Sequence, residues 1–341
     1  MSLVSRQIRL ASRPVGAPKP ENFSHQEQPV RPPETGEVVL RTLYLSLDPY
    51  VRGRMSEAKS YANPMQLGDV VVGGTVSEVV ESASDALRPR QLVVAYGGWQ
   101  TYSTERASSL RILDPDQAPI TTALGVLGMP GFTAYSGLLH IAKPEAGETL
   151  AVAAATGPVG ATVGQIAKIM GCRTIGIAGG LRKVEHLHEL GFDVALDHRE
   201  DDLGGRLGDA APDGIDIYFE NVGGAVWDAV LPRLNKFARV PVCGLAANYN
   251  LSGLPEGPDR SQALLRAVLD NSLTLRGFIQ NEFAPTMYDA FLRDMGSWVR
   301  EGRVKYREDI TDGLDHAPEA FTGMLQGKNF GKTLVRVAEH S

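Results

Sequence analysis

The segment from Leu150 to Met170 constrains the fold of this 341-residue chain more than any other part of it. An apolar run, Leu150–Ala155, leads to Gly157 and Gly160, after which apolar residues recur at helical spacing. This order predicts a buried strand, a tight turn and an amphipathic helix in direct succession. Glycines in such a turn let the backbone approach a pyrophosphate, which the free amides at the helix start can hold. Strand–helix turns that bind no nucleotide have the same pattern. The strands and helices that follow therefore decide whether this turn indicates a dinucleotide site.

Strand and helix patterns alternate after this turn, which favours a dinucleotide site. We predict five further strands, with helical stretches between most of them, at Thr174–Ala178, Asp193–Leu196, Ile215–Phe219, Ala238–Cys243 and Leu273–Ile279. Alternation of this kind predicts parallel βαβ units, and hence an α/β fold with a doubly wound parallel sheet.

The first third of the chain has a different pattern. Three runs rich in Val, Leu and Tyr lie between turns that contain Gly, Pro or Asp, at Val38–Leu47, Asp69–Glu81 and Gln91–Ser103. They predict a small twisted barrel or an antiparallel sheet. The chain is long enough for two domains, and a last apolar run, Thr333–Val337, is expected to return to the first of them.

Composition excludes several kinds of protein. A formal charge of −6 argues against nucleic-acid or anionic-membrane partners. The uncharged stretches 117–142 and 149–167 are broken by Gly and Pro, so neither is expected to span a membrane. Met1–Pro20 is polar and lacks the apolar core of a signal peptide. With only two cysteines, Cys172 and Cys243, no disulfide framework is expected, and the protein is predicted to be cytoplasmic.

The residues after the second strand of the nucleotide-binding pattern indicate which dinucleotide binds. An NAD site has an acidic residue there, which accepts a hydrogen bond from a ribose hydroxyl. This chain has Gly179-Gly180-Leu181-Arg182-Lys183 instead. Basic side chains near a helix start attract a 2′-phosphate, so we predict NADPH as the cofactor, although ordinary solvated helix residues would give the same pattern.

The sequence offers no set of residues typical of a catalytic metal site. No cysteine precedes Cys172, and the early histidines His25 and His140 are isolated. His186 and His188 are two residues apart on an expected helix, about 200° around its axis, and cannot converge on one ion. We therefore expect no metal, and we expect catalysis to depend on the cofactor, hydroxyl groups and backbone dipoles.

Five stretches of the chain occur in the order expected of a known family. They are Leu45–Met55, Met129–Tyr135, Ala154–Gly160, Glu220–Gly224 and Gly327–Lys332. With them the sequence resembles the zinc-independent medium-chain dehydrogenase/reductases, which include NADPH-dependent 2-alkenal (double-bond) reductases, leukotriene/prostaglandin reductases and bacterial curcumin reductases.

The resemblance implies two domains and an activity. A GroES-like β-barrel catalytic domain would comprise residues 1–125 and 305–341, and a Rossmann NADPH-binding domain would comprise residues 126–304. Homodimers joined through the Rossmann sheets are common in the family. The implied reaction is hydride transfer from NADPH to the β-carbon of an α,β-unsaturated aldehyde or ketone, followed by protonation of the α-carbon.

The resemblance also implies which residues bind the cofactor. The pyrophosphate would lie against the glycine turn, at Gly157, Pro158, Val159 and Gly160. The nicotinamide side would be lined by Asn221, Cys243, Tyr249 and Asn329 and by the backbone of Phe278, Ile279 and Gln280.

The 2′-phosphate would lie against Lys183. The family usually has a second contact from a tyrosine, where this chain has His198. A histidine can still donate a hydrogen bond to the phosphate, although a solvated turn histidine is an equal alternative. Arg199 or Arg182 could replace the contact.

Two tyrosines are candidates for catalysis. Reduction of an enone needs a hydrogen-bond donor at the oxygen of the enolate, and a tyrosine hydroxyl can serve. Tyr50 matches the family's substrate-pocket tyrosine and Tyr249 lies on the cofactor side, although each could simply pack in a cleft. The alternatives to an enone reductase are a quinone reductase of the same superfamily, a dehydrogenase acting on lipid alcohols, and a non-catalytic NADPH-binding protein.

Overall fold

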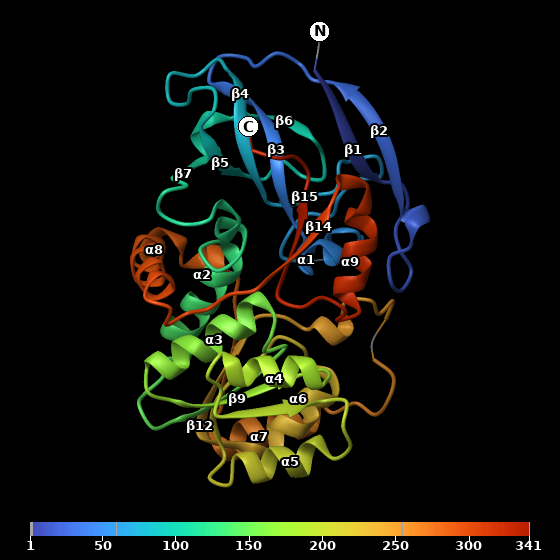
Figure 1. Cartoon of the computed structure of the whole chain (residues 1–341). Coiled ribbons are helices and arrows are strands. Elements are labelled where there is room, and N and C mark those ends of the chain that lie inside the picture. The colour runs from blue at the N-terminus through green and yellow to red at the C-terminus, as the bar shows by residue number, and fades with distance from the viewer. Residues whose placement is uncertain (1–2, 59, 254, 341) are drawn as a thin grey trace. The chain divides into compact units, whose positions relative to one another are not determined.

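The computed structural model describes residues 3–58, 60–253 and 255–340. The chain divides into two compact units, whose helices and strands are labelled in Figure 1. The first unit consists of Met1–Gly125, Tyr249–Ser252 and Glu308–Ser341. The second consists of Val126–Asn248 and Gly253–Arg307.

Six parallel strands form the sheet of the second unit, in the order β10-β9-β8-β11-β12-β13. They are β8 (Thr149–Ala153), β9 (Arg173–Ala178), β10 (Val194–Asp197), β11 (Ile215–Phe219), β12 (Leu234–Val242) and β13 (Thr274–Gly277). The chain runs outward from β8 to β10, returns to the middle at β11 and then runs outward to β13. The switch point between β8 and β11 is the position where such sheets bind ligands. The predicted doubly wound parallel sheet is confirmed.

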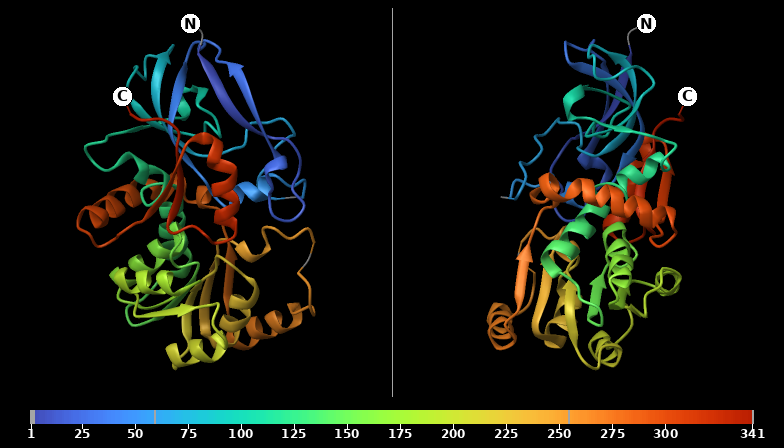
Figure 2. Two further views of the ribbon diagram at one scale, coloured as in Figure 1. Left: turned by 45° about the vertical axis from the view of Figure 1, so that its right-hand side comes forward. Right: turned by 90° about the vertical axis from the view of Figure 1, so that its left-hand side faces the viewer.

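Helices cover both faces of this sheet (Figure 2). They are α2 (Met129–Ser136), which continues into a π-helical turn at Gly137–Ala142, α3 (Pro158–Ile169), α4 (Leu181–Glu189), α5 (Leu203–Ala210), α6 (Gly224–Val230), α7 (Ser261–Asn271) and α8 (Ala284–Arg300). One core layer contains Phe132, Ile166 and Phe291, and the other contains Leu207 and Val230. Burial of these apolar faces is the main term that favours the fold. Among the residues described, no helix has both the length and the apolar composition needed to cross a bilayer.

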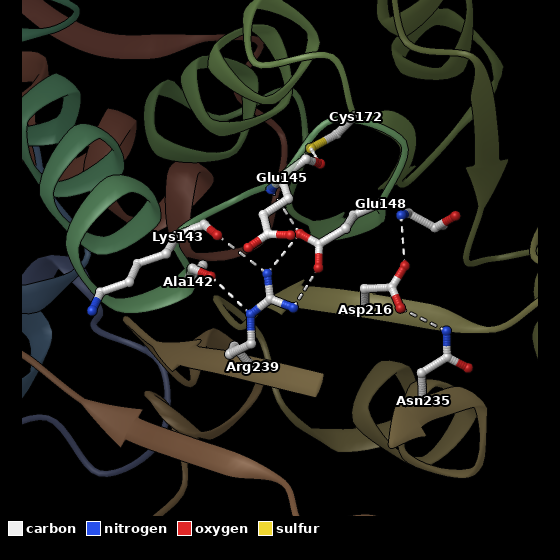
Figure 3. Close-up of polar contacts among 9 residues, drawn as sticks. Ala142, Lys143, Glu145, Glu148, Cys172, Asp216, Asn235 and Arg239 are labelled. Carbon is white, nitrogen blue, oxygen red and sulfur yellow. Dashed lines mark hydrogen bonds and ion pairs between the residues drawn. The ribbon is translucent and has the colours of Figure 1, made fainter. Parts of the chain in front are cut away.

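A polar network lies at the amino-terminal edge of this sheet (Figure 3). Arg239 on β12 forms a two-pronged ion pair with Glu148, which precedes β8, and both N–O distances are 2.6 Å. The same guanidinium donates to the carbonyl of Ala142 at 2.8 Å and to that of Lys143 at 3.3 Å. Because Lys143 ends the π-helical turn with a left-handed backbone (φ 49°), Arg239 caps that helix and ties it to the sheet.

The first unit contains a larger sheet with the strand order β14-β15-β3-β4-β5-β7, in which β6 also pairs with β3, and a separate β1-β2 pair. The strands are β1 (Val4–Leu10), β2 (Phe23–Pro29), β3 (Glu37–Ser46), β4 (Thr75–Ser82), β5 (Leu92–Ala95), β6 (Tyr102–Arg106), β7 (Arg111–Leu113), β14 (Glu308–Asp312) and β15 (Lys332–Arg336). The helices α1 (Tyr50–Arg54) and α9 (Ala317–Leu325) belong to the same unit. Because β15 pairs antiparallel with β3, the last apolar run returns to the first unit, as predicted.

Two strand predictions for this unit were wrong in their bounds. The run Asp69–Glu81 becomes a strand only from Thr75, because its first residues bond to β1 instead of β3: the amide of Leu10 donates to the carbonyl of Asp69 at 2.9 Å, and the amide of Val71 donates to the carbonyl of Ile8 at 3.0 Å. The run Gln91–Ser103 is divided between β5 and β6. Between them lies Gly98, whose φ of +75° a β-strand residue does not adopt.

Candidate active site

The glycine turn lies between β8 and α3, as the sequence predicted. Gly157 precedes the helix with an extended backbone, and Pro158 occupies the first helical turn, where its missing amide costs nothing. A Cβ on Gly160 would lie 2.5 Å from the carbonyl oxygen of Ala154, so this glycine allows the helix to approach the strand. A Cβ on Gly157 would meet one atom of the chain, at 3.2 Å, so at this position the chain itself leaves room for a bound group.

Ala154 begins this turn in the left-handed region, with φ +50°. An alanine there is strained by about 1 kcal/mol relative to glycine. Ala154 is the first residue of the Ala-x-x-Gly-x-x-Gly pattern. The turn therefore has a left-handed first residue although that residue is not the glycine that would fit the conformation best.

Basic side chains gather at the ends of β9 and β10. A Cβ on Gly179 would lie 2.7 Å from Nε2 of His198 and 2.9 Å from Nε of Arg199, so both side chains pack over this glycine. Lys183, in the first turn of α4, is close enough to affect the imidazole. Burial lowers the pKa of His198, and the positive charges of Arg199 and Lys183 lower it further, against the attraction of Asp197.

The carboxylate of Asp197 turns toward the backbone rather than toward these cations. It accepts the amide of Arg199 at 2.9 Å and also the amide of Gly180, and these bonds hold its pKa low although burial acts in the opposite direction. The carboxylate therefore organises the two loops, and the cationic side chains form an electropositive surface that suits a phosphate dianion.

Asn221 follows β11 and spans the switch point of the sheet. Its side-chain amide donates to the carbonyl of Ala153, at the end of β8, at 3.0 Å. The buried carboxylate of Glu220 shapes the loop that follows, because its Oε1 accepts the amides of Val222 at 2.6 Å and Gly223 at 2.8 Å. Nothing in the local pattern predicts this role for Glu220, apart from its place in the Glu-Asn-Val-Gly-Gly stretch.

Cys243 and the segment after β13 complete the expected nicotinamide side of the second unit. Burial raises the pKa of the Cys243 thiol to about 12, and the nearby Glu220 adds to the shift, so the thiol is neutral. Phe278 is buried with its ring edge-on to Phe219, and the amide of Ile279 donates to a glutamate oxygen at 2.8 Å. The side chain of Gln280 donates to the neighbouring Asn281.

The expected cofactor residues of the second unit therefore follow the carboxyl ends of its parallel strands, along one edge of the sheet. Three expected residues belong to the first unit instead, namely Tyr50, Tyr249 and Asn329. Tyr249 is half-buried and follows a short 3-10 turn, and the side chain of Asn329 donates to the carbonyl of Gly331 at 3.0 Å.

Tyr50 is the first residue of α1 and is half-buried. Burial raises the pKa of its phenol, the charge of Asp48 and the phenols of Tyr96 and Tyr61 raise it further, and Arg54 acts in the opposite direction. The phenol is therefore a hydrogen-bond donor throughout the neutral range. Tyr61 and Tyr96 were not singled out by sequence reasoning, because isolated loop tyrosines carry no pattern.

Among the described residues, no group of three or more His, Cys, Asp or Glu side chains is arranged to hold a metal ion.

Comparison with known proteins identifies the family. A family model described as the N-terminal domain of oxidoreductase matches residues 6–113, and one described as zinc-binding dehydrogenase matches residues 158–295. The chain is 56% identical to the NADPH-dependent curcumin reductase of Escherichia coli (strain K12), over 98% of this chain and 97% of that protein. It is 41% identical to prostaglandin reductase 1 of Sus scrofa, over 94% of this chain and 96% of that protein.

A solved structure extends this similarity to three dimensions. CurA from Vibrio vulnificus, in complex with NADPH, superposes with a TM-score of 0.94 at 50% identity, over 98% of this chain and 99% of that one. The chain therefore belongs to the medium-chain dehydrogenase/reductase family, in the zinc-independent branch of the curcumin and prostaglandin reductases, with its N-terminal GroES-like and Rossmann folds.

Proposed function

We propose that this protein reduces the carbon–carbon double bond of α,β-unsaturated aldehydes and ketones with NADPH, without a metal. The observation that carries the proposal is the end-to-end similarity to an NADPH-dependent curcumin reductase at 56% identity. In this proposal the first unit binds the substrate and the second binds the cofactor. We also propose that the protein is cytoplasmic, because two cysteines provide no disulfide framework, and that it is a homodimer, as the family resemblance implies.

The residues present fit NADPH. Gly157 to Gly160 would hold the pyrophosphate, because the helix start carries free amides and Gly157 leaves room above the backbone. Lys183, His198 and Arg199 would hold the 2′-phosphate, because His198 and Arg199 pack over Gly179, the charge of Lys183 reaches His198, and the carboxylate of Asp197 is bonded to backbone amides. The expected nicotinamide contacts are those named above, from Asn221, Cys243, Tyr249, Phe278, Ile279, Gln280 and Asn329.

When bound, NADPH supplies a hydride, which adds to the β-carbon with its electron pair. Tyr50 would donate a hydrogen bond to the carbonyl oxygen of the substrate, where negative charge develops as the enolate forms. Its raised pKa keeps the proton on the phenol, so Tyr50 acts as a donor and not as a base. Tyr249 is the second candidate for this role. Solvent would supply the proton that the α-carbon takes up.

The neutral thiol of Cys243 is no nucleophile at physiological pH. A covalent adduct between an enone and this cysteine is therefore not part of the proposed reaction. The side chain would act by its shape alone.

The test is NADPH oxidation, followed at 340 nm, with a series of 2-alkenals, a chalcone-like enone and a quinone, together with identification of each product. A saturated aldehyde or ketone supports the proposal. An allylic alcohol, or turnover of the quinone alone, would refute it in favour of one of the other oxidoreductase activities. Tight NADPH binding without turnover of any acceptor would indicate a non-catalytic binding protein.

A further inference from the structure

A buried lysine joins two sequence motifs of the first unit that are far apart along the chain. Lys332, the first residue of β15, is 3% exposed. Its ammonium donates to a carboxylate oxygen of Asp48 at 3.0 Å, to the carbonyl of Leu47 at 2.8 Å and to that of Thr333 at 3.2 Å. Three acceptors around one ammonium use all its protons, which compensates for the loss of hydration.

Asp48 lies at the corner where β3 ends and α1 begins, and it is 4% exposed. The hydroxyl of Ser46 donates to its second carboxylate oxygen. Both oxygens are thus bonded, one to the hydroxyl and one to Lys332. The corner that precedes Tyr50 is therefore fixed by a buried charged pair and by the carbonyl of Leu47.

The helix α1 needs such external support, because five residues are too few for a helix that is stable in isolation. Val51 and Met55 pack in the apolar core of the first unit, and two cations make further polar contacts with the segment. Arg52 donates to the carbonyl of Gly16 at 2.9 Å, and Arg13 donates to the carbonyl of Met55, just after the helix, at 3.0 Å. Lys332 supports the amino end, where Tyr50 begins the helix.

We propose that Lys332, acting through Asp48 and the carbonyl of Leu47, is a positioning residue for Tyr50, so that the Gly327–Lys332 stretch contributes to the reaction as well as to the sheet. The proposal rests on the proposed function in one respect, the role of Tyr50 as hydrogen-bond donor. The geometry that carries it belongs to the first unit alone.

The test is a double-mutant cycle on enone turnover. Lys332→Met alone would leave a buried carboxylate unpaired and is expected to impair folding, so the variant is Asp48→Asn/Lys332→Met, which replaces the pair by neutral groups of similar size. Its kcat should fall at least tenfold with tyrosine at position 50, and less than twofold when Tyr50→Phe is already present. KM for NADPH should change less than twofold in both backgrounds. Equal losses of kcat in both backgrounds would overturn the proposal, because the pair would then act on the whole fold.

Arg336→Met is the matched control. Arg336 is on the same strand as Lys332, and the change removes its exposed ion pair with Asp312 of β14, at 2.5 Å, without involving α1. Its kcat should stay within twofold of that of the unmodified protein.

A second measurement does not depend on activity. In protein labelled with 3-fluorotyrosine, the 19F signal that disappears in Tyr50→Phe should shift or broaden in Asp48→Asn/Lys332→Met and in Lys332→Arg, but not in Arg336→Met. An unchanged signal would overturn the proposal even if the protein reduced no enone, whereas absence of enone reduction by the unmodified protein would refute the proposed function alone.

Discussion

Replacing Arg239 by methionine tests the energetics of the network at the amino-terminal edge of the second unit's sheet (Figure 3). Methionine keeps most of the apolar stem and removes the two bonds to Glu148 and those to the carbonyls of Ala142 and Lys143. The two charged side chains are only 22% and 20% exposed. Loss of one partner of a buried pair costs about 3–5 kcal/mol. Because water reaches this pair in part, we expect the lower limit, about 3 kcal/mol of free energy of unfolding.

For a unit of this size, about 3 kcal/mol corresponds to a fall of about 6–12 °C in Tm, which calorimetry can measure. The control is Arg266→Met, which removes an exposed ion pair with Asp270 on α7 and should cost less than about 0.5 kcal/mol. Equal Tm values for the two variants would refute the reasoning.

The pH dependence provides a second check on the Arg239 variant. Burial of Glu148 acts to raise its pKa, but hydrogen bonds from Arg239 and from the amide of Glu145, with the charge of Arg239, lower it below the ordinary value of 4.5. A carboxylate whose pKa is lower in the folded than in the unfolded protein stabilises the fold fully at pH values above its pKa in the unfolded state. That contribution is lost as the pH falls through its pKa in the folded state. The Tm difference between the unmodified protein and Arg239→Met should therefore narrow below about pH 4.5. A constant difference would contradict this assignment.

Four further predictions concern single residues. Ala154→Gly should raise the free energy of unfolding by about 0.5–1 kcal/mol in urea titrations, because it relieves the left-handed backbone at φ +50°; a loss of stability would contradict that strain. Lys183→Ala should raise KM for NADPH at least tenfold and leave KM for NADH within twofold, and an equal change for both cofactors would remove Lys183 from the phosphate site. In the folded protein, mass spectrometry should find Cys243 unmodified by iodoacetamide at pH 8, since its pKa is about 12; rapid alkylation would reveal a thiolate. Leu269 on α7 is 76% exposed, and Leu269→Asp should weaken the proposed homodimer in sedimentation velocity, whereas an unmodified protein that is monomeric would contradict the dimer itself.

Sequence reasoning succeeded where structure depends on neighbours along the chain. The turn from β8 to α3 could be predicted because strand, glycines and helix are consecutive, and the strands of the doubly wound sheet each have their own apolar run. Boundaries failed where the backbone changes direction inside an apolar run. Strand β12, for example, begins at Leu234 instead of the predicted Ala238. Phe237 within it has φ +68°, a conformation that the presence of a phenylalanine does not predict.

Side-chain contacts between distant residues could not be predicted. Asp48 and Lys332 each appear in a motif, but 284 positions separate them, and a composition or spacing rule does not connect them. Gln165 on α3 makes another contact of this kind. Its side-chain NH2 donates to the carbonyl of Lys305 at 2.9 Å, and its side-chain oxygen accepts the amide of Lys305 at 2.7 Å. Such contacts require the packed fold first, so they are consequences of tertiary structure that leave no local pattern.

Three titratable side chains of the candidate site share one electrostatic property. Burial raises the pKa values of Tyr50, Cys243 and Glu220, in the last case against the effect of bonded backbone amides. Each group therefore holds its proton more firmly than it would in water. Fixed positive charge is found instead at Lys183 and Arg199, beside the ends of β9 and β10. In the proposed function, affinity for the anionic cofactor and hydrogen-bond donation to the developing enolate would depend on different residues. A change in the cations should then alter KM for the cofactor, and a change at Tyr50 should alter turnover.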